Sequence, residues 1–494
     1  MLSVSGCRGI IGETLTPEVA ARFAGAFGAF LRERGRGTPP TVVLGRDGRR
    51  GSDVVSAAAS AGLAGAGCRV LDLGIATTPT VAVQTDALAR GAGGAAGMVV
   101  TASHNPQMWC GLKCLLAEGG EHGSAACAPP PDAAAEIIRR FERGEAGAVP
   151  WALTGSIERL EGADEEHVER VLGALEASGV CEDACDLGEG LAVVLDSVNA
   201  SGIDAGRGLL EGVGCTEILH LGSERTGVFS HPPEPTLENL TLPGGLCDAV
   251  RESGADVGFA QDPDADRLAI IDERGRYIGE EYTLALGARA LLEAERRRAG
   301  TAEGCVLVTN LSTSRMLDDV ARAYGARVER TPVGEAHVVE AMKRLAAQGA
   351  RVIAGGEGNG GLIWPRVAYV RDSLSSMAMI LALLRAGGGR VRVSDLVGSI
   401  PAYAIEKRKV DLPRREDAAA GLEAVARAYA AQRVDRRDGV WVDFTSGPLA
   451  GKAWLHVRPS NTEPILRLIA EAPTTAQAEG ILDQAAEHLG VPAR

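Results

Sequence analysis

The 494-residue sequence has few aromatic side chains and lacks a long apolar run. Phe, Trp and Tyr together make up 4% of the chain, so we expect helices that pack through small residues, chiefly Ala and Gly. No stretch approaches the ~20 consecutive apolar residues that a membrane-spanning helix needs. A membrane span is therefore not expected, and a hydrophobic content of 45% with 23% charged residues is typical of a globular protein.

An excess of positive charge is also lacking. Lys and Arg number 51 against 65 Asp and Glu, which gives a formal net charge of −14. This balance argues against a nucleic-acid partner and against binding to an anionic membrane, because both need a basic surface. An anionic small substrate remains compatible with it, since one site can be basic within an acidic protein.

The cysteines lack the spacing of a zinc site. Two pairs, Cys110/Cys114 and Cys181/Cys185, have three intervening residues, and neither shows the Cys-x-x-Cys and histidine pattern of a structural zinc centre. The first residues, MLSVSGCRGIIGETLTPE, lack the charged segment and apolar core of a signal peptide. We therefore expect reduced thiols and a cytoplasmic location.

Short β-rich runs alternate with longer Ala-rich helical stretches. The first set contains TVVLGRD (41–47), CRVLDLG (68–74) and GMVVTAS (97–103), and similar sets begin at LAVVLDS (191–197) and CVLVTNL (305–311). This βαβ rhythm predicts three related α/β units, each with a mostly parallel sheet. In such sheets, ligands bind beyond the carboxyl ends of the strands.

The last ~110 residues have a different pattern. VWVDF (440–444) and AWLHVRPS (453–460) are predicted to form antiparallel strands, with helices near 416–432 and 474–489. These features indicate a smaller α+β domain, reached through the flexible joint AGGGRVR (386–392). The predicted domain limits are 1–150, 155–274, 275–385 and 390–494.

Polar residues are concentrated after the strand GMVV (97–100), in the segment TASHNPQ (101–107). Pro106 stops regular structure, so Ser103 is expected at an exposed strand end. Past WCGLK we expect a helix, whose partly positive N-terminus suits a phosphate. The segment is compatible either with a corner that carries a nucleophile or with an ordinary capping turn.

The segment QDPDADR (261–267) places Asp262, Asp264 and Asp266 at alternate positions. Crowded carboxylates repel one another without a cation, so they indicate a site for a hard divalent ion such as Mg²⁺. An EF-hand is disfavoured, because Arg267 stands where its glycine is needed and the apolar run LAII follows. A solvated acidic turn is the remaining alternative. Arg267 can offset charge or bind a phosphate oxygen.

Five glycines surround Glu357 and Asn359 in GGEGNGG (355–361). Glycine lets the backbone approach a ligand closely, while a carboxylate and an amide suit paired sugar hydroxyls. The pattern differs from a dinucleotide fingerprint. A plain glycine-rich turn is equally compatible with it.

Hydroxyl, amide and guanidinium groups are combined in HVRPSNTEPILR (456–467). With backbone N–H groups, they can form a phosphate cradle stiffened by two prolines. The alternative is a capped helix start. The candidate phosphate ligands are Arg458, Ser460, Asn461, Thr462 and Arg467.

These segments occur in a familiar order, which is SGCRG (5–9), GRDGR (45–49), TASHNPQMWCGLK (101–113), DPDADR (262–267), TPVGEAHV (331–338), GEGNGG (356–361) and RPSNTEPILR (458–467). In them the sequence resembles the α-D-phosphohexomutase family, which includes phosphoglucomutases, phosphomannomutases and phosphoglucosamine mutases. The resemblance extends nearly from end to end.

The resemblance implies a four-domain, heart-shaped enzyme that interconverts 6-phospho and 1-phospho sugars in a central cleft. Ser103 would carry a phosphate as phosphoserine and would complete a Mg²⁺ site with the three aspartates. The phosphoserine would phosphorylate its phosphosugar substrate, and the 1,6-bisphosphate, also the expected activator, would reorient and return the other phosphate. Closure of the last domain would exclude water.

The resemblance also assigns roles to single residues. Arg8, His104 and Lys113 would assist the reaction at Ser103. Substrate binding would involve Arg267, Glu357, Asn359, Arg458, Ser460, Asn461, Thr462 and Arg467. The expected partners are a phosphosugar substrate and, at most, a second copy of the chain, since the protein is predicted to be a monomer or homodimer.

The sequence departs from the family pattern at several positions. Gly361 stands where many bacterial members have a histidine in G-E-x-S-G-H, so that histidine's acid/base role cannot be transferred, and His337 is a conjectural substitute. Cys110 replaces an asparagine, and Asn461 replaces a common glycine. GEGNGG paired with RPSNTEP resembles the archaeal-type phosphoglucosamine mutases and favours glucosamine phosphate.

Three other functions are alternatives for the same pattern. A phosphoglucomutase or phosphomannomutase would need the same loops. A non-catalytic phosphosugar-binding regulator would need neither Ser103 nor the three aspartates. A metal-dependent phosphatase would not need a whole domain that grips the second phosphate.

Overall fold

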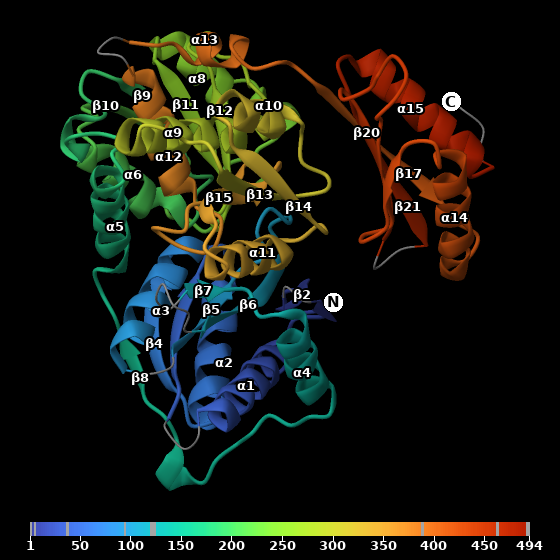
Figure 1. Cartoon of the computed structure of the whole chain (residues 1–494). Coiled ribbons are helices and arrows are strands. Elements are labelled where there is room, and N and C mark those ends of the chain that lie inside the picture. Colours follow the sequence, from blue (N-terminus) through green and yellow to red (C-terminus); the bar gives the residue numbers. More distant parts are fainter. Residues whose placement is uncertain are drawn as a thin grey trace.

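The computed structural model describes residues 2–3, 6–35, 39–92, 95–118, 125–386, 390–460 and 464–490. Four sheets organise these residues. Figure 1 shows the first three sheets within one body and the C-terminal sheet beside it. In the described ranges, no helix combines the length and the apolar character needed to cross a membrane.

The first unit has an eight-stranded sheet with the order β1-β2-β6-β5-β3-β4-β8, and β7 pairs with β6. Its strands are β1 (Leu2–Ser3), β2 (Gly6–Ile10), β3 (Thr41–Arg46), β4 (Arg69–Ile75), β5 (Ala95–Val100), β6 (Trp109–Glu118), β7 (Ala125–Cys127) and β8 (Ile157–Arg159). Its helices are α1 (Pro17–Arg34), α2 (Ser52–Gly65), α3 (Thr78–Ala92) and α4 (Pro131–Glu142). Because β8 pairs with β4, this sheet includes a strand from the range 155–274 assigned to the second unit.

The prediction of a helix past WCGLK is wrong, because this segment continues as strand β6. β6 lies antiparallel to both β5 and β2. Cys110, Leu112 and Cys114 alternate along it and are buried in the core, whereas Lys113 between them is only partly buried. The alternation has the two-residue period of a strand rather than the longer period of a helix.

The second unit contains a four-stranded sheet with the order β10-β9-β11-β12. Its elements are α5 (Ala163–Ala177), β9 (Ala192–Asp196), α6 (Gly202–Gly212), β10 (Glu217–Leu221), α7 (Leu237–Leu240), α8 (Leu246–Ser253), β11 (Val257–Gln261) and β12 (Leu268–Ile271). β10, β9 and β11 are parallel, and β12 returns antiparallel to β11.

The third unit repeats this topology with the order β14-β13-β15-β16. Its elements are α9 (Glu281–Ala299), β13 (Cys305–Asn310), α10 (Met316–Ala323), β14 (Arg327–Thr331), α11 (Glu335–Ala347), β15 (Arg351–Glu357), β16 (Gly361–Ile363) and α12 (Ser373–Leu384). Strands β4-β3-β5-β6 of the first sheet have the same arrangement, three parallel and one antiparallel. The three units are therefore related in structure, as the sequence predicts.

The C-terminal unit is an antiparallel sheet with the order β17-β21-β20-β19-β18. Its elements, reached through α13 (Val393–Gly398), are β17 (Ala404–Asp411), α14 (Ala418–Ala428), β18 (Arg433–Asp435), β19 (Val440–Asp443), β20 (Trp454–Pro459), β21 (Ile465–Ala472) and α15 (Thr475–His488). The predicted antiparallel pairing of the strands near 440–444 and 453–460 is confirmed by β19 and β20.

The hydrophobic cores explain the two-part shape in Figure 1. One continuous core cluster joins the first three units, with members such as Val43, Leu195 and Leu286, whereas the C-terminal sheet has its own. A small third cluster connects the two parts, where Trp441 and Trp454 pack against Leu311. The C-terminal unit is thus a separate body attached to the third unit.

Candidate active site

A buried arginine shapes the loop that carries Ser103. Ser103 follows β5 in the left-handed conformation, with φ 51°, and its N–H donates to the hydroxyl of Thr101 at 2.8 Å. Arg49 donates to the Ser103 carbonyl at 2.6 Å and pairs with Asp47 at 2.8 Å. The side chain of Arg49 also lies over the ring of Phe229. Sequence reasoning noted Arg49 only as part of a motif, and the structure shows that it positions the serine.

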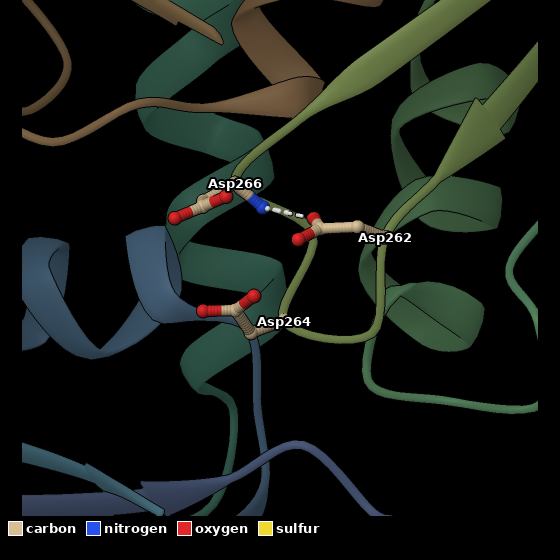
Figure 2. A group of neighbouring side chains, drawn as sticks. All are labelled: Asp262, Asp264 and Asp266. Carbon is tan, nitrogen blue, oxygen red and sulfur yellow. Dashed lines mark hydrogen bonds between the residues drawn. The ribbon is translucent and has the colours of Figure 1, made fainter. Parts of the chain in front are cut away.

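Three aspartates converge in the loop between β11 and β12, as Figure 2 shows. Their candidate ligand oxygens all lie within 4.8 Å of one another, and all three residues are buried. One oxygen of Asp262 accepts from the N–H groups of Asp266 and Arg267, each at 3.1 Å. Ser103 donates its hydroxyl to the other oxygen at 2.8 Å. The serine and aspartate loops, 159 residues apart, therefore meet.

The aspartate cluster fits a hard cation. Asp264 Oδ1 and Asp266 Oδ1 are buried and have no hydrogen-bond partner among the described residues. Burial and the two neighbouring carboxylates raise the pKa of Asp262 well above its ordinary value. Buried carboxylate oxygens without donors are the ligands that Mg²⁺ prefers. The strand β12 directly after the loop is incompatible with an EF-hand.

Lys113 contacts the aspartates rather than the serine. Its ammonium lies 2.5 Å from Asp264 Oδ2 and 3.3 Å from Asp266 Oδ2. Burial opposes the charged form, but the two carboxylates outweigh it and hold the pKa of Lys113 above its ordinary value. Lys113 therefore remains a cation beside the serine loop.

His104 lies beside Ser103, and Arg8 lines the same cleft. His104 Nδ1 is 3.4 Å from the Ser103 hydroxyl, the long end of a hydrogen bond. Burial, with Arg267 and Arg8 nearby, lowers the pKa of His104 to about 3, so its ring is neutral near pH 7. Burial also lowers the pKa of Arg8, although Asp264 and Asp266 oppose this shift.

Glu357 and Asn359, the two polar residues of the glycine-rich segment 355–361, both contact Arg371. Glu357 is buried and pairs with Arg371 at 3.0 Å, while it accepts from Asn310 at 2.8 Å. Asn359 also accepts from Arg371, at 3.3 Å. In the described part of the chain, the residues that line the cleft at Ser103 include Glu335 but neither Glu357 nor Asn359.

Arg371 is a functional candidate that sequence reasoning missed. Its guanidinium pairs with Asp266 at 2.7 Å and with Glu335 at 2.8 Å, in addition to Glu357. Burial opposes its charge, but these carboxylates hold the pKa of Arg371 well above its ordinary value. A lone arginine before the helix-capping Asp372 gives no local signal of this role.

The phosphate-loop residues are only partly described. Arg458 lines the cleft and pairs with Asp438 at 3.3 Å. Arg467 lies opposite Arg458 in the pairing of β20 and β21 and is exposed. Ser460 is buried, while Asn461 and Thr462 lie outside the described residues.

Asp438 and His456 attach the C-terminal unit to the third unit. Asp438 accepts from the Val333 N–H at 3.0 Å. His456 contacts the Ser312 hydroxyl at 2.8 Å and the Asp438 carbonyl at 2.7 Å. These contacts bring Arg458 to the cleft.

Basic side chains from all four units line one cleft of 510 Å³ together with Ser103. They are Arg8, Lys113, Arg267, Arg371, Arg437 and Arg458. The acidic lining residues described are Glu335 and Asp438. This local excess of positive charge in a chain of net charge −14 favours an anionic ligand. A larger cavity of 730 Å³ contains none of the predicted site residues, so the chemistry is assigned to the smaller cleft.

Known protein families match four consecutive parts of the chain. Residues 2–146, 160–275 and 280–403 match the phosphoglucomutase/phosphomannomutase alpha/beta/alpha domains I, II and III. Residues 408–488 match the phosphoglucomutase/phosphomannomutase C-terminal domain.

Individual relatives match over almost the whole chain. A probable phosphoglucosamine mutase of Methanopyrus kandleri is 34% identical and aligns over 97% of this chain and 95% of its own length. A phosphoglucomutase/phosphomannomutase of Thermococcus kodakarensis is 33% identical over 97% of this chain and 96% of its own. The crystal structure of a phosphoglucomutase/phosphomannomutase family protein from Burkholderia thailandensis superposes with a TM-score of 0.76 at 24% identity, covering 100% of this chain and 99% of that one.

Proposed function

This chain belongs to the phosphoglucomutase/phosphomannomutase family and is a phosphohexomutase, and from that premise we propose that Ser103 carries the phosphoryl group it transfers. The supporting observation is the contact of the Ser103 hydroxyl with Asp262 at 2.8 Å, beside the buried aspartates and inside a basic cleft. This contact supports the proposal, because it leaves the Ser103 hydroxyl next to groups that would offset phosphate charge.

In the proposed reaction, phosphoserine at Ser103 donates its phosphoryl group to the free hydroxyl of a monophosphosugar. The bond from Ser103 Oγ to phosphorus breaks, a bond from phosphorus to the sugar oxygen forms, and the proton of the sugar hydroxyl ends on Ser103 Oγ, which regains its hydroxyl. The bound 1,6-bisphosphate then reorients, and Ser103 takes the other phosphoryl group in the reverse step. Mg²⁺ bound at the three aspartates would supply positive charge that offsets the charge on the transferring group.

The side chains of the cleft have separable tasks in this proposal. Lys113 keeps Asp264 charged. Arg437, which lines the cleft, joins the residues proposed from the sequence to hold the phosphate that does not react, which are Arg458, Ser460, Asn461, Thr462 and Arg467. Glu357 and Asn359 remain the proposed readers of sugar hydroxyls, with Glu335 and Arg371 added because both line the cleft. Fixed positions of this kind can contribute much of a rate enhancement.

For the substrate we propose glucosamine phosphate, with glucose or mannose phosphate as the alternative. Pairing of GEGNGG with RPSNTEP favours the first, and the similarity to the Methanopyrus protein agrees with it. A comparable identity to the Thermococcus protein supports the alternative. A panel of glucosamine, glucose, mannose and N-acetylglucosamine phosphates, with Mg²⁺ and a 1,6-bisphosphate activator, decides between them. Absence of turnover with all four would end the mutase proposal.

Ser103→Ala tests the phosphoryl carrier. We expect the wild-type chain to gain about 80 Da, the mass of one phosphoryl group, after incubation with sugar 1,6-bisphosphate, and the variant to gain nothing and lose turnover. Intact-mass spectrometry provides the measurement. Ser253→Ala, at an exposed helix end, is the matched control and should keep the adduct. An adduct that persists in Ser103→Ala would show that another residue carries the group.

Asp264→Asn tests the metal site. Removing one of three clustered charges should weaken Mg²⁺ binding, measured by titration calorimetry on the unphosphorylated chain, and should abolish most turnover. Asp272→Asn is the control, because Asp272 is a buried carboxylate that pairs with Arg276 outside the cluster. Equal Mg²⁺ affinity in wild type and Asp264→Asn would place the metal elsewhere.

We further propose that the enzyme works in the cytoplasm as a monomer or homodimer and uses sugar 1,6-bisphosphate as activator. Light scattering after size-exclusion chromatography measures the assembly. A trimer or larger species would contradict this part of the proposal.

A further inference from the structure

The 730 Å³ cavity lies where the first three units meet. Its walls include parts of α3 from the first unit, α5 from the second and α9 from the third, together with residues 364–369. Within the described residues, it shares no lining residue with the cleft at Ser103. Its volume lies within the range of small-molecule sites, about 300 to 1,000 Å³.

Arginines dominate the charge of this cavity. Five of them line it, against the two carboxylates Asp86 and Glu295. Asp86 pairs with Arg90 and Arg170, each at 2.5 Å, so one carboxylate offsets two guanidinium groups. Glu295 likewise pairs with two arginines of the cavity, at 2.8 and 3.1 Å. The cavity therefore keeps a positive surplus, which suits an anion.

Arg366 adds a cation that is not offset locally. It is exposed on the cavity wall and, within the described part of the chain, makes no hydrogen bond or ion pair. Arg90, on α3 of the first unit, is also half exposed, with 52% of its side chain accessible. Both guanidinium groups can thus turn to a ligand without leaving a buried carboxylate unpaired.

Two buried polar atoms point to a ligand that is more than a simple anion. Asp86 is 4% exposed and Ser178 is 8% exposed, and both line the cavity. Asp86 Oδ1 and the Ser178 hydroxyl have no hydrogen-bond partner in the described ranges. Buried polar atoms are normally paired. A ligand hydroxyl can donate to Asp86 and accept from Ser178, and so satisfy both atoms.

The cavity also has an apolar wall. Leu291, Trp364 and Val367 contribute to it and are almost fully buried. An apolar wall beside a few convergent polar groups is the usual composition of a small-molecule site.

We propose that this cavity binds a hydroxylated phosphate ester, a second ligand distinct from the substrate in the cleft. The phosphate lies between Arg90 and Arg366, and the hydroxyl groups reach Asp86 and Ser178. Such a ligand bridges three units and contacts the segment 364–369, which leads directly to Arg371. The site does not depend on which sugar the enzyme converts.

Calorimetric titration of the full chain with uridine monophosphate tests the proposal, because this ester carries hydroxyls and is not a hexose phosphate. We expect saturable binding that weakens at least tenfold in the double variant Arg90→Gln/Arg366→Gln and weakens measurably in Ser178→Ala. Inorganic phosphate and uridine should each bind more weakly than the ester. Both arginines are exposed, so the double variant should fold with an unchanged melting temperature.

Arg458→Gln serves as the reciprocal control, because it alters the catalytic cleft alone. Uridine monophosphate affinity should be the same in this variant as in wild type. Affinity lost in Arg458→Gln but kept in the double variant would place the ester in the catalytic cleft and overturn the proposal. Absence of binding at millimolar ester overturns it as well, and phosphate binding as tightly as the ester overturns the assigned ligand class. Turnover without the ester should be unchanged in the double variant, so the mutase proposal is judged separately.

Discussion

At the scale of one residue, Arg371 connects the aspartate loop at Asp266 to the glycine–glutamate loop at Glu357. One guanidinium contacts Asp266 in the β11–β12 loop, Glu335 at the start of α11 and Glu357 at the end of β15. Without a cation these buried acids would repel one another and would have to bind protons. Arg371 therefore offsets the charge of these acids and links the segments that carry them.

Arg371→Met should cost about 3–5 kcal/mol of unfolding free energy, because it leaves buried carboxylates without a partner. Arg371→Lys should cost less, since it keeps the charge but loses the planar fork that reaches several acids at once. Urea unfolding of the full chain gives both values. Arg207→Met, which breaks an exposed ion pair with Glu211, is the matched control and should change stability by about 0.5 kcal/mol or less. Equal effects of Arg371→Met and Arg207→Met would contradict this role.

At the scale of secondary-structure elements, three of the predicted loops are structurally equivalent. In each of the first three units, the loop joins the third parallel strand to the antiparallel strand beside it. These are the connections β5–β6, β11–β12 and β15–β16. One repeated topology thus presents the serine, aspartate and glycine–glutamate loops at corresponding strand ends.

Arg49 fixes the first of these loops, and lysine cannot replace it. Its guanidinium donates to the carbonyls of Ser103, Asn105 and Trp109 together, whereas an ammonium cannot match this planar geometry. Arg49→Lys should lower kcat on the order of 100-fold with a smaller change in KM, because a shift near 1 Å misplaces the nucleophile. Steady-state kinetics with the preferred phosphosugar measure both constants. Arg50→Lys, at the exposed neighbouring position, should change neither, and a normal kcat in Arg49→Lys would refute the positioning role.

The sequence allowed the strand-end loops to be predicted, because their polar residues interrupt apolar runs at the ends of strands. It also allowed the three repeated units to be recognised from their rhythm. Arg371 and Arg437 could not be found in this way, since each reaches the cleft only through tertiary packing. The prediction of a helix past WCGLK was wrong for a related reason. That segment is a strand because it pairs with β2 on one side and with β5 on the other.

At the scale of the whole molecule, the junction between the C-terminal unit and the third unit contains a buried acid, Glu471. Glu471 is fully buried and accepts from the Arg315 N–H of the third unit at 2.9 Å. Burial raises the pKa of Glu471 to about 7 from an ordinary value of 4.5. Between these two pH values the folded chain holds a proton that the unfolded chain has released. The contribution of Glu471 to stability must therefore fall as pH rises through this window and then level off.

Glu471→Gln should flatten this part of the pH profile. The stability difference between pH 4.5 and pH 7 should shrink on the order of 3 kcal/mol, the equivalent of the shift in pKa. Unfolding of wild type and variant in denaturant across pH 4 to 8 measures the difference. A residual slope should remain below about pH 6, because burial also raises the pKa of Asp164 to about 6. An unchanged slope between pH 6 and 7 would show that Glu471 is already ionised in the folded chain.

The tryptophans at the same junction make it visible by fluorescence. Trp441 is 6% exposed and Trp454 is fully buried, and in the described part of the chain neither indole N–H has a hydrogen-bond partner. Indole rings shielded from water in this way have an emission maximum at short wavelength. Trp151 is 88% exposed, so its emission maximum is already that of an indole in water. Because Trp109 and Trp364 also contribute to the emission, a red shift that is lost in Trp441→Phe would report water entering between the C-terminal unit and the rest of the enzyme. Compared with that variant, the wild-type emission gives substrate titrations a readout of this junction without an added label.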